Sequence, residues 1–355
     1  MIKSAYIHIP FCKSKCRYCS FISYTQTDLK EDYLNALLKE IRHYYKGELL
    51  DTIYFGGGTP SLLTVSEFEK LLGMFNFNEK TEITAELNPE TLSQEYLNGL
   101  KSTGINRISI GCQTFDDNIL KLIGRRHNSK QAEAAVKFAQ NAGFDNISLD
   151  FIYGLLNQTV KMFEDDLKHA LSLNIAHISL YGLKIDKGCY FYTHRPQNLP
   201  DEDIQADMYL KAIEILKDFN HYEISNFGKP SRHNLNYWNN NNYYGFGAAA
   251  HGYIESTRYS NFETLEKYIQ NPLNHAFETL LTKQQRLEEE IFLGLRKTSG
   301  LDLSKINKKF NIDFEKKYSN ILKKYRDFFV KTDSGYALNT RGIMVSSSIL
   351  SEFLD

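Results

Sequence analysis

A regular alternation of short β-rich runs with longer amphipathic segments fills the first 220 residues and constrains the fold more than any other feature. The β-rich runs lie at 4–10, 51–55, 82–88, 107–113, 146–153 and 177–183. Segments with helical periodicity follow them at 28–46, 64–75, 93–102, 129–142, 159–173 and 201–219. Strands that alternate with helices predict right-handed βαβ units and a parallel sheet. Six such units suit an α/β fold with an incomplete (β/α)6 barrel rather than the closed barrel of eight.

The rest of the chain has a different character and predicts two further regions. Residues 221–280 are rich in Asn, Tyr, Gly and His, lack a helical period, and include four consecutive asparagines at 239–242. Residues 281–355 are rich in Lys, Glu and Leu, with an aromatic, strand-like stretch at 328–338. We therefore expect a partial barrel over 1–220, an irregular extension over 221–280, and a small, mostly helical C-terminal domain of winged-helix type over 281–355.

Composition narrows the classes of function. The chain has 355 residues and a formal net charge of −1, whereas a general nucleic-acid binder is usually clearly basic. No apolar run approaches the roughly 18–20 residues of a membrane span. The first expected strand begins at residue 4, which leaves no room for a secretory signal. We therefore expect a cytoplasmic protein with no integral membrane segment and no nucleic-acid partner, and these features do not distinguish a monomer from a dimer.

Three of the five cysteines, Cys12, Cys16 and Cys19, fall within eight residues. A short loop with this spacing can direct three thiolates to one small site. A four-iron cluster can use three thiolates and leave one iron open to a further ligand. A structural zinc would need a fourth partner, such as His8 or a distant residue, and unliganded thiols are the remaining alternative. Neither of the other two cysteines is expected to bind the cluster. Cys112 is expected to be a small buried residue, and Cys189, in a loop, could be an exposed thiol.

The segment around the triplet, residues 6–19 (YIHIPFCKSKCRYC), resembles the radical S-adenosylmethionine (SAM) superfamily and, within it, the oxygen-independent coproporphyrinogen oxidase-like group. The resemblance implies that the three cysteines hold a [4Fe-4S] cluster and that SAM binds its fourth iron. Electron transfer from the cluster would then cleave SAM to a 5′-deoxyadenosyl radical. Tyr6 and Tyr18 match positions that touch the cofactor in this family, although an aromatic residue here is otherwise usually part of the core.

The segment 55–60 (FGGGTP) resembles the glycine motif that follows the second strand in the same family. Glycines allow the backbone to approach a ligand that a Cβ atom would keep away. The resemblance implies that backbone donors and carbonyls of Gly57, Gly58 and Thr59 meet the amino end of the methionine part of SAM. From the residues alone, the motif could also be only a turn that ends a strand.

Four polar residues at or after later strands also match ligand-contacting positions of the family: Glu86, Gln113, Arg125 and Asp150. An acid at Glu86 can pair with the ammonium group of SAM, Arg125 can grip a carboxylate with two hydrogen bonds, and Asp150 can accept from a ribose hydroxyl. Each of these residues is also compatible with a purely structural role.

Two features separate this chain from the true oxidases of the group. Those members carry a fourth cysteine two residues after the triplet, where this chain has Phe21, and a long segment before the cysteines, where this chain has eleven residues. The sequence better resembles the heme chaperone branch, through 233–238 (HNLNYW) and 245–252 (GFGAAAHG). This resemblance implies that the protein binds heme and passes it to acceptor proteins, whose identity the sequence does not indicate.

Two histidines in these motifs, His233 and His251, are candidate heme ligands, since heme iron accepts axial histidine. Neighbouring aromatic residues could cover a porphyrin face. His233 could instead buttress the barrel through hydrogen bonds, and His251 could contact SAM. Two other functions stay open at this point: a radical enzyme acting on a porphyrinogen, and a zinc-stabilised barrel that serves as an interaction module.

Overall fold

The structure is a computed structural model that describes residues 2–354. Its centre is a run of six parallel strands that pair in chain order. They are β1 (Ser4–Ile9), β2 (Thr52–Gly57), β3 (Glu82–Leu87), β4 (Arg107–Gln113), β5 (Asn146–Tyr153) and β6 (His177–Gly182). Strands β1 and β6 do not pair with each other, so the barrel is incomplete. The predicted fold class is confirmed.

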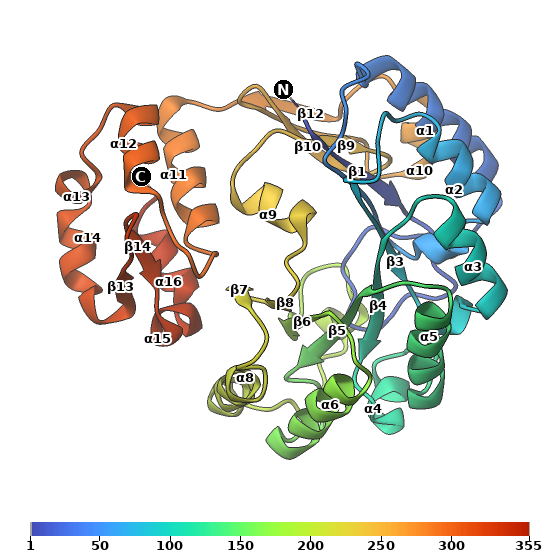
Figure 1. Ribbon diagram of the computed structural model, residues 1–355, viewed down its shortest axis with the longest axis horizontal. Coiled ribbons are helices and arrows are strands. Elements are labelled where there is room, and N and C mark those ends of the chain that lie inside the picture. Colours follow the sequence, from blue (N-terminus) through green and yellow to red (C-terminus); the bar gives the residue numbers. More distant parts are fainter. Residues whose placement is uncertain (1, 355) are drawn as a thin grey trace.

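Helices connect these strands and cover the outside of the curved sheet (Figure 1). They are α1 (Lys30–Tyr44), α2 (Val65–Leu72), α3 (Gln94–Ser102), α4 (Asp117–Leu122), α5 (Ser129–Asn141), α6 (Val160–Ser172), α7 (Tyr190–Thr193) and α8 (Glu202–Ile215). Short 3₁₀ turns follow β2 and β3, at Pro60–Leu62 and Pro89–Thr91. Local chemistry places these helices. For example, Thr64 and Glu67 form a reciprocal capping box that starts α2.

The two faces of each strand explain why the barrel has both a core and a cavity. On β4, Ile108 and Ile110 are fully buried in the apolar core that includes the helices. The alternate residues Arg107, Ser109 and Gln113 point the other way and line an internal pocket. Successive strand residues point to opposite faces, so the apolar residues bind the helices to the sheet while the polar ones face the inside of the barrel.

Residues 221–280 are more regular than expected. Three short strands extend the central sheet: β8 (Asn226–Gly228) beside β6, β7 (His221–Glu223) beyond it, and β9 (Tyr244–Phe246) parallel to β1. A separate antiparallel sheet contains β10 (His251–Ile254), β11 (Thr257–Ser260) and β12 (Phe277–Leu280). Helices α9 (Arg232–Trp238) and α10 (Leu265–Gln270) complete the segment. Elements of three to seven residues are too short to show a period in the sequence.

The C-terminal part is mostly helical and stands beside the barrel (Figure 1). It contains α11 (Lys283–Gly294), α12 (Leu303–Phe310), α13 (Phe314–Lys317), α14 (Ser319–Lys324), a 3₁₀ turn (Arg326–Phe328), α15 (Thr340–Met344) and α16 (Ser346–Ser351). The strand-like stretch forms a hairpin of β13 (Phe329–Lys331) and β14 (Tyr336–Leu338). These elements share a hydrophobic cluster to which Tyr209 of α8 also contributes. The expected domain boundaries and the winged-helix comparison stay predictions.

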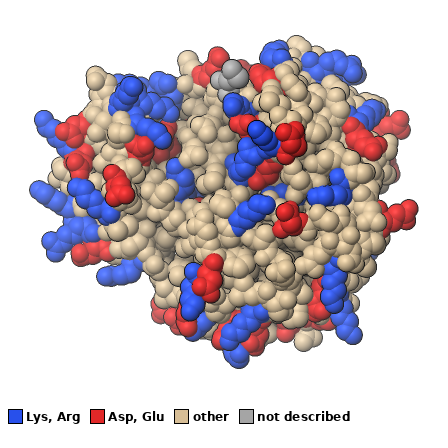
Figure 2. All heavy atoms as spheres, viewed as in Figure 1, with Lys and Arg blue, Asp and Glu red and all other residues tan. Residues whose placement is uncertain are grey.

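The surface and the helix lengths complete the description. Figure 2 shows Lys and Arg mixed with Asp and Glu on the visible face, with many of the basic residues over the C-terminal helices. Between residues 2 and 354, no helix is both long and apolar enough to cross a membrane.

Candidate functional site

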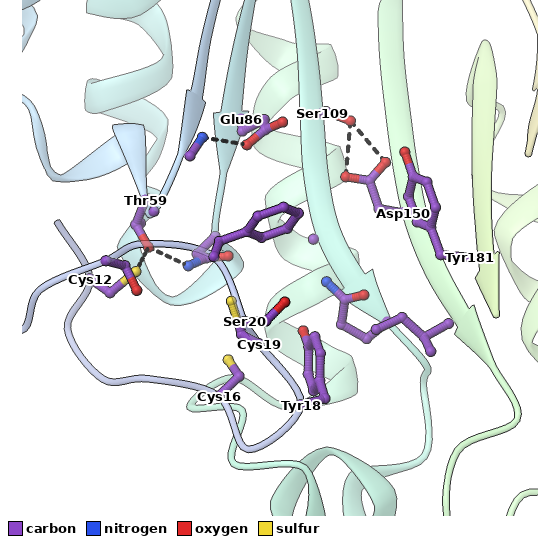
Figure 3. A pocket seen from close by; sticks show the side chains of 18 of the residues that line it. Cys12, Cys16, Tyr18, Cys19, Ser20, Thr59, Glu86, Ser109, Asp150 and Tyr181 are labelled. Atoms are coloured by element: carbon purple, nitrogen blue, oxygen red, sulfur yellow. Dashed lines mark hydrogen bonds between the residues drawn. The ribbon is translucent and has the colours of Figure 1, made fainter. Parts of the chain in front are cut away.

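A cavity of about 480 Å³ occupies the inside of the barrel. Strands β2 to β6 and the cysteine loop line it, and Figure 3 shows cysteine sulfurs and strand side chains facing the same space. The structure brings together eleven of the fourteen residues predicted from the sequence: Cys12, Cys16, Tyr18, Cys19, Gly57, Gly58, Thr59, Glu86, Gln113, Arg125 and Asp150. Tyr6, His233 and His251 lie outside its lining.

Backbone hydrogen bonds close the cysteine loop on itself and hold it to the segment after α4. The amide of Cys12 donates to the carbonyl of Tyr24 at 2.9 Å, and the amide of Arg17 donates to the carbonyl of Ile123, after α4, at 2.9 Å. The three thiols are half-buried. Burial raises the pKa of Cys12, while the Thr59 hydroxyl, which donates to Cys12 Sγ at 3.4 Å, acts to lower it.

The three cysteines line the cavity from one loop. In the described part of the chain, no group of three or more His, Cys, Asp or Glu side chains is arranged to hold a single metal ion. A [4Fe-4S] cluster distributes its cysteine ligands over separate irons, so three half-buried thiols on one cavity wall fit a cluster. Burial also raises the pKa of Cys19, to about 11.

The other two cysteines lie away from this loop, and both are buried. Cys112 is a small buried residue, as predicted. Cys189, for which an exposed thiol was considered, is only 4% exposed because it packs in a small apolar cluster with Phe191 and Leu155.

The glycine motif packs tightly against β1 and the cysteine loop. Gly57 has φ +111°, and a Cβ there would lie 2.5 Å from the His8 ring, while a Cβ on Gly58 would lie 2.7 Å from a carbonyl of the loop. All three amides are used within the chain. The amide of Gly57 donates to Glu86 at 3.1 Å, and those of Gly58 and Thr59 donate to carbonyls at 2.9 and 2.7 Å. The expected amide donors are therefore already engaged, which leaves only carbonyls of this motif for a ligand.

Glu86 is an acid in the cavity wall with a strongly raised pKa. Burial raises its pKa to about 7, although the Tyr54 hydroxyl, donating at 2.8 Å, acts to lower it. A bound cation would stabilise the charged carboxylate, so the residue suits an ammonium partner. Tyr6 lies behind this group. A Cβ on Gly56 would be 3.0 Å from the Tyr6 and Tyr54 rings and 3.2 Å from the Glu86 carboxyl carbon, so the glycine makes room for all three.

Asp150 and Gln113 face the cavity from β5 and β4. Ser109 Oγ lies 2.9 and 3.1 Å from the two carboxylate oxygens of Asp150, whose pKa is raised by burial. Gln113 has φ +70° and follows an irregularity in the pairing of β4 with β5. Left-handed backbone at a residue other than glycine costs about 1–3 kcal/mol and clusters at functional sites. At the end of β4, this left-handed conformation places the Gln113 side chain on the cavity wall.

Arg125 is held differently from the expectation. Its Nη2 donates to the Gly111 carbonyl at 2.7 Å and to Asn88 Oδ1 at 2.9 Å, and its Nη1 lies 3.7 Å from Cys16 Sγ. Asn88 Nδ2 in turn donates to Thr59 Oγ1 at 2.8 Å. The guanidinium thus faces the cysteine loop, and much of its capacity is already used. Sequence reasoning missed Asn88, whose only signal was its place two residues after Glu86.

The two candidate heme histidines differ in accessibility. His233 is 1% exposed, and both ring nitrogens have partners at 2.8 Å: Nδ1 with Thr52 Oγ1 and Nε2 with Tyr237 Oη. Its ring stacks on Tyr54, with centroids 5.0 Å apart, and burial lowers its pKa to about 3. His251 begins β10 and is exposed. His233 therefore buttresses the amino ends of the strands, whereas His251 is open to a ligand.

Comparison with known proteins places the chain in a family. Residues 6–170 match the model of the radical SAM superfamily, and residues 281–345 match the HemN C-terminal domain. The chain is 41% identical to the heme chaperone HemW of Lactococcus lactis over 89% of this chain and 87% of that protein. The chain belongs to the HemW family. It is also 37% identical to the heme chaperone HemW of Bacillus subtilis over 99% of both chains.

A solved structure supports the fold independently. Coproporphyrinogen III oxidase (HemN) from Escherichia coli, described as a radical SAM enzyme, superposes with a TM-score of 0.86 over 99% of this chain and 90% of that one. The two sequences are 23% identical, so the likeness concerns the fold. The resemblance predicted from the cysteine segment and the motifs 233–238 and 245–252 is confirmed.

Proposed function

We propose that this protein is a heme chaperone: it binds heme, a [4Fe-4S] cluster and SAM, and it transfers heme to acceptor proteins in the cytoplasm. The observation that carries the proposal is the near full-length similarity to relatives named heme chaperone HemW. The cavity that joins the cysteine triplet to the polar strand ends supports the two cofactors. The acceptor proteins are unidentified.

The cavity residues fit the cofactors by their chemistry. Cys12, Cys16 and Cys19 would hold the cluster, and Glu86 would receive the ammonium group of SAM. Cluster and SAM together, when bound, supply one-electron reductive chemistry. The chain itself contributes orientation. Thr59 and Arg125 donate toward two of the three sulfurs, at 3.4 and 3.7 Å, and hydrogen bonds to thiolate sulfur tune the electronic properties of such a site.

His251 is the better candidate for a heme ligand. A histidine that ligates iron needs a free ring nitrogen. Ligation by His233 would require the loss of its hydrogen bond to Thr52 or to Tyr237 and a break in the packing at the base of the barrel. His251 is exposed, so it could ligate iron without losing a hydrogen bond or disturbing the packing.

The alternative function is a radical enzyme that acts on a porphyrinogen. Phe21, which stands where oxidases of the group carry a fourth cysteine, lines the cavity and is 69% exposed. An apolar ring at this place offers a contact for a flat apolar ligand and no sulfur for a metal. Phe21 at this position therefore supports heme binding more than oxidation of a porphyrinogen.

One experiment separates these functions. The protein is reconstituted anaerobically with iron and sulfide and titrated with heme, followed by absorbance, while SAM cleavage is assayed in the same sample. We expect about one heme per chain, reduced by His251→Ala and unchanged by His43→Ala, an exposed control on α1. His233→Ala should lower stability more than heme affinity. Heme transfer to an apoprotein is then measured directly.

Two outcomes would overturn the proposal. The absence of specific heme uptake, combined with 5′-deoxyadenosine formed in step with porphyrinogen loss, would establish the radical enzyme. A reconstituted protein that contains zinc without iron or sulfide would instead support a zinc-stabilised interaction module.

A further inference from the structure

A buried arginine at the inner end of the cavity has no partner that accounts for its charge. Arg107 begins β4, is 1% exposed, and lines the cavity. Its Nε and Nη1 atoms have no hydrogen-bond acceptor. Among residues 2–354, no carboxylate forms a salt bridge with it. A buried, unpaired charge is costly unless something compensates it.

On the two neighbouring strands, the residues at the same level of the barrel also have buried polar atoms without hydrogen-bond partners. Thr84 on β3 and Asn146 on β5 pair in register with Arg107 on either side. Thr84 Oγ1 and Asn146 Oδ1 are also buried without hydrogen-bond partners. In parallel strands, residues in register point to the same face, so the three side chains lie on the same side of the sheet. Arg107 and Thr84 offer unpaired donors there, whereas the unpaired Asn146 atom is an acceptor. Buried polar groups are rarely left unpaired, and a cluster of them indicates a bound group.

The charges around this layer favour an anion. The positive charge of Arg107 acts to lower the pKa of Glu86 and of Asp150, so it is felt across the cavity, yet neither acid reaches it. Both acids lie further along their strands toward the cysteine loop, beside the region proposed for SAM (Figure 3). A buried guanidinium with free donors attracts an anion, and a carboxylate accepts charge-assisted hydrogen bonds from it. The Thr84 hydroxyl adds a third donor.

We propose that Arg107, which lines the inner end of the barrel cavity, forms a carboxylate-binding subsite together with the Thr84 hydroxyl beside it. Arg107 supplies the charge, and Thr84 donates a hydrogen bond. The carboxylate could belong to a small free acid or be the propionate arm of a tetrapyrrole. The second source rests on the proposed function, whereas the subsite does not.

The test uses the reconstituted full-length protein and two kinds of probe. First, the midpoint of thermal unfolding is measured in rising sodium propionate, against sodium chloride at equal ionic strength. Wild type should show a saturable rise because a ligand that binds only the folded state stabilises it. Arg107→Met should lose the rise, and Arg107→Lys should retain part of it.

The same variants separate a binding role from a structural one. Without propionate, Arg107→Met should unfold at or above the wild-type temperature because it removes an uncompensated buried charge. Arg258→Met is the matched control. Arg258 pairs with Glu289 through two hydrogen bonds of 3.0 and 2.9 Å, so its loss leaves a partner unpaired and should lower the midpoint. If Arg107→Met lowered the unfolding midpoint as much as Arg258→Met does, Arg107 would be structural and the proposal would be wrong.

Second, iron mesoporphyrin is compared with its dimethyl ester. If the tetrapyrrole is the source, wild type should bind the free acid about tenfold or more tightly than the ester, and Arg107→Met should bind the two equally. Equal affinities in wild type, with the propionate response intact, identify a small free acid as the occupant. Heme binding with no discrimination and no propionate response would overturn the subsite and leave the proposed function standing. A propionate response without any heme binding would overturn the proposed function and leave the subsite standing.

Discussion

Glu40 offers the sharpest test of the forces that hold the 221–280 segment on the barrel. This residue of α1 is buried and accepts three hydrogen bonds from that segment. The amide of Gly247 donates at 2.8 Å, and Asn261 Nδ2 and the Tyr268 hydroxyl donate as well. Despite these donors, burial raises the pKa of Glu40 to about 7. The perturbation is Glu40→Gln.

The sign and size of the effect follow from that pKa. An unfolded glutamate has a pKa near 4.5, so the folded chain holds the proton between pH 4.5 and about 7 while the unfolded chain has lost it. The free energy of unfolding therefore falls as pH rises through this window. At about 1.4 kcal/mol per pKa unit, the loss is about 3 kcal/mol, complete above pH 7. Glutamine cannot ionise, so its variant lacks this slope.

The assay is urea unfolding of wild type and Glu40→Gln at several pH values from 4 to 8. The amide of glutamine meets the Asn261 amide as a second donor, which adds a constant destabilisation at every pH. The informative quantity is thus the change with pH in the difference between the two proteins. Wild type should lose about 3 kcal/mol relative to the variant as pH rises from about 4.5 to 8.

A difference that stays constant over this range would refute the reasoning. It would mean that the three donors stabilise the carboxylate enough to offset its burial. A difference that changes in favour of wild type as pH rises would show that the ionised carboxylate is the preferred form in the folded protein.

Three further predictions concern the site and the loop after β4. Cys19→Ser should lower iron bound after anaerobic reconstitution, measured with sulfide by colorimetry, whereas Cys189→Ser should retain the wild-type content. Gly57→Ala should cost about 2–5 kcal/mol in urea unfolding because it combines a left-handed φ with a clash against β1. Gly47→Ala, with φ +87° and no atom within 4 Å of its new Cβ, should cost only the backbone part, and equal losses would contradict the clash. Asp166 on α6 accepts hydrogen bonds from the Thr114 hydroxyl at 2.7 Å and the Phe115 amide at 2.8 Å, both in the loop after β4, and burial raises its pKa from 3.8 to about 6. The stability of wild type relative to Asp166→Asn should therefore fall by about 3 kcal/mol between about pH 4 and 6 and level off above. A fall that continues above pH 7 would assign the effect to another group.

Much of the barrel was predictable because its signals are local. Each strand carries a continuous or alternating apolar run, and each helix has a face that must be buried. Caps such as Thr64 with Glu67 mark where helices start. The predicted strand bounds lie within two residues of those observed. Because parallel strands end at the same edge, the polar residues after them could also be expected to meet.

The rest depends on contacts between distant segments. Strand β9 has three residues and pairs with β1 more than 200 positions earlier, which no local pattern reveals. Helix α9 begins where Ser231 caps the amide of Asn234, within an aromatic stretch that has no period. Arg107 is the clearest miss. A charged residue at the start of a strand usually marks the boundary with solvent, and only the folded barrel shows that this one points inward.

Helix α9 has a consequence for how the two ends of the molecule communicate. One side of the helix contacts β2, where His233 packs on Tyr54 in the cavity wall. Its other end meets the C-terminal helices, where the Arg296 guanidinium lies 4.3 Å from the centre of the Trp238 ring and Lys297 donates to Asn239 at 2.7 Å. A partner that displaced the C-terminal helices would either break these contacts or move this helix and, with it, the wall of the cavity. Thermodynamic linkage makes such an effect reciprocal: if docking there changes affinity inside the barrel by some factor, filling the barrel changes docking by the same factor.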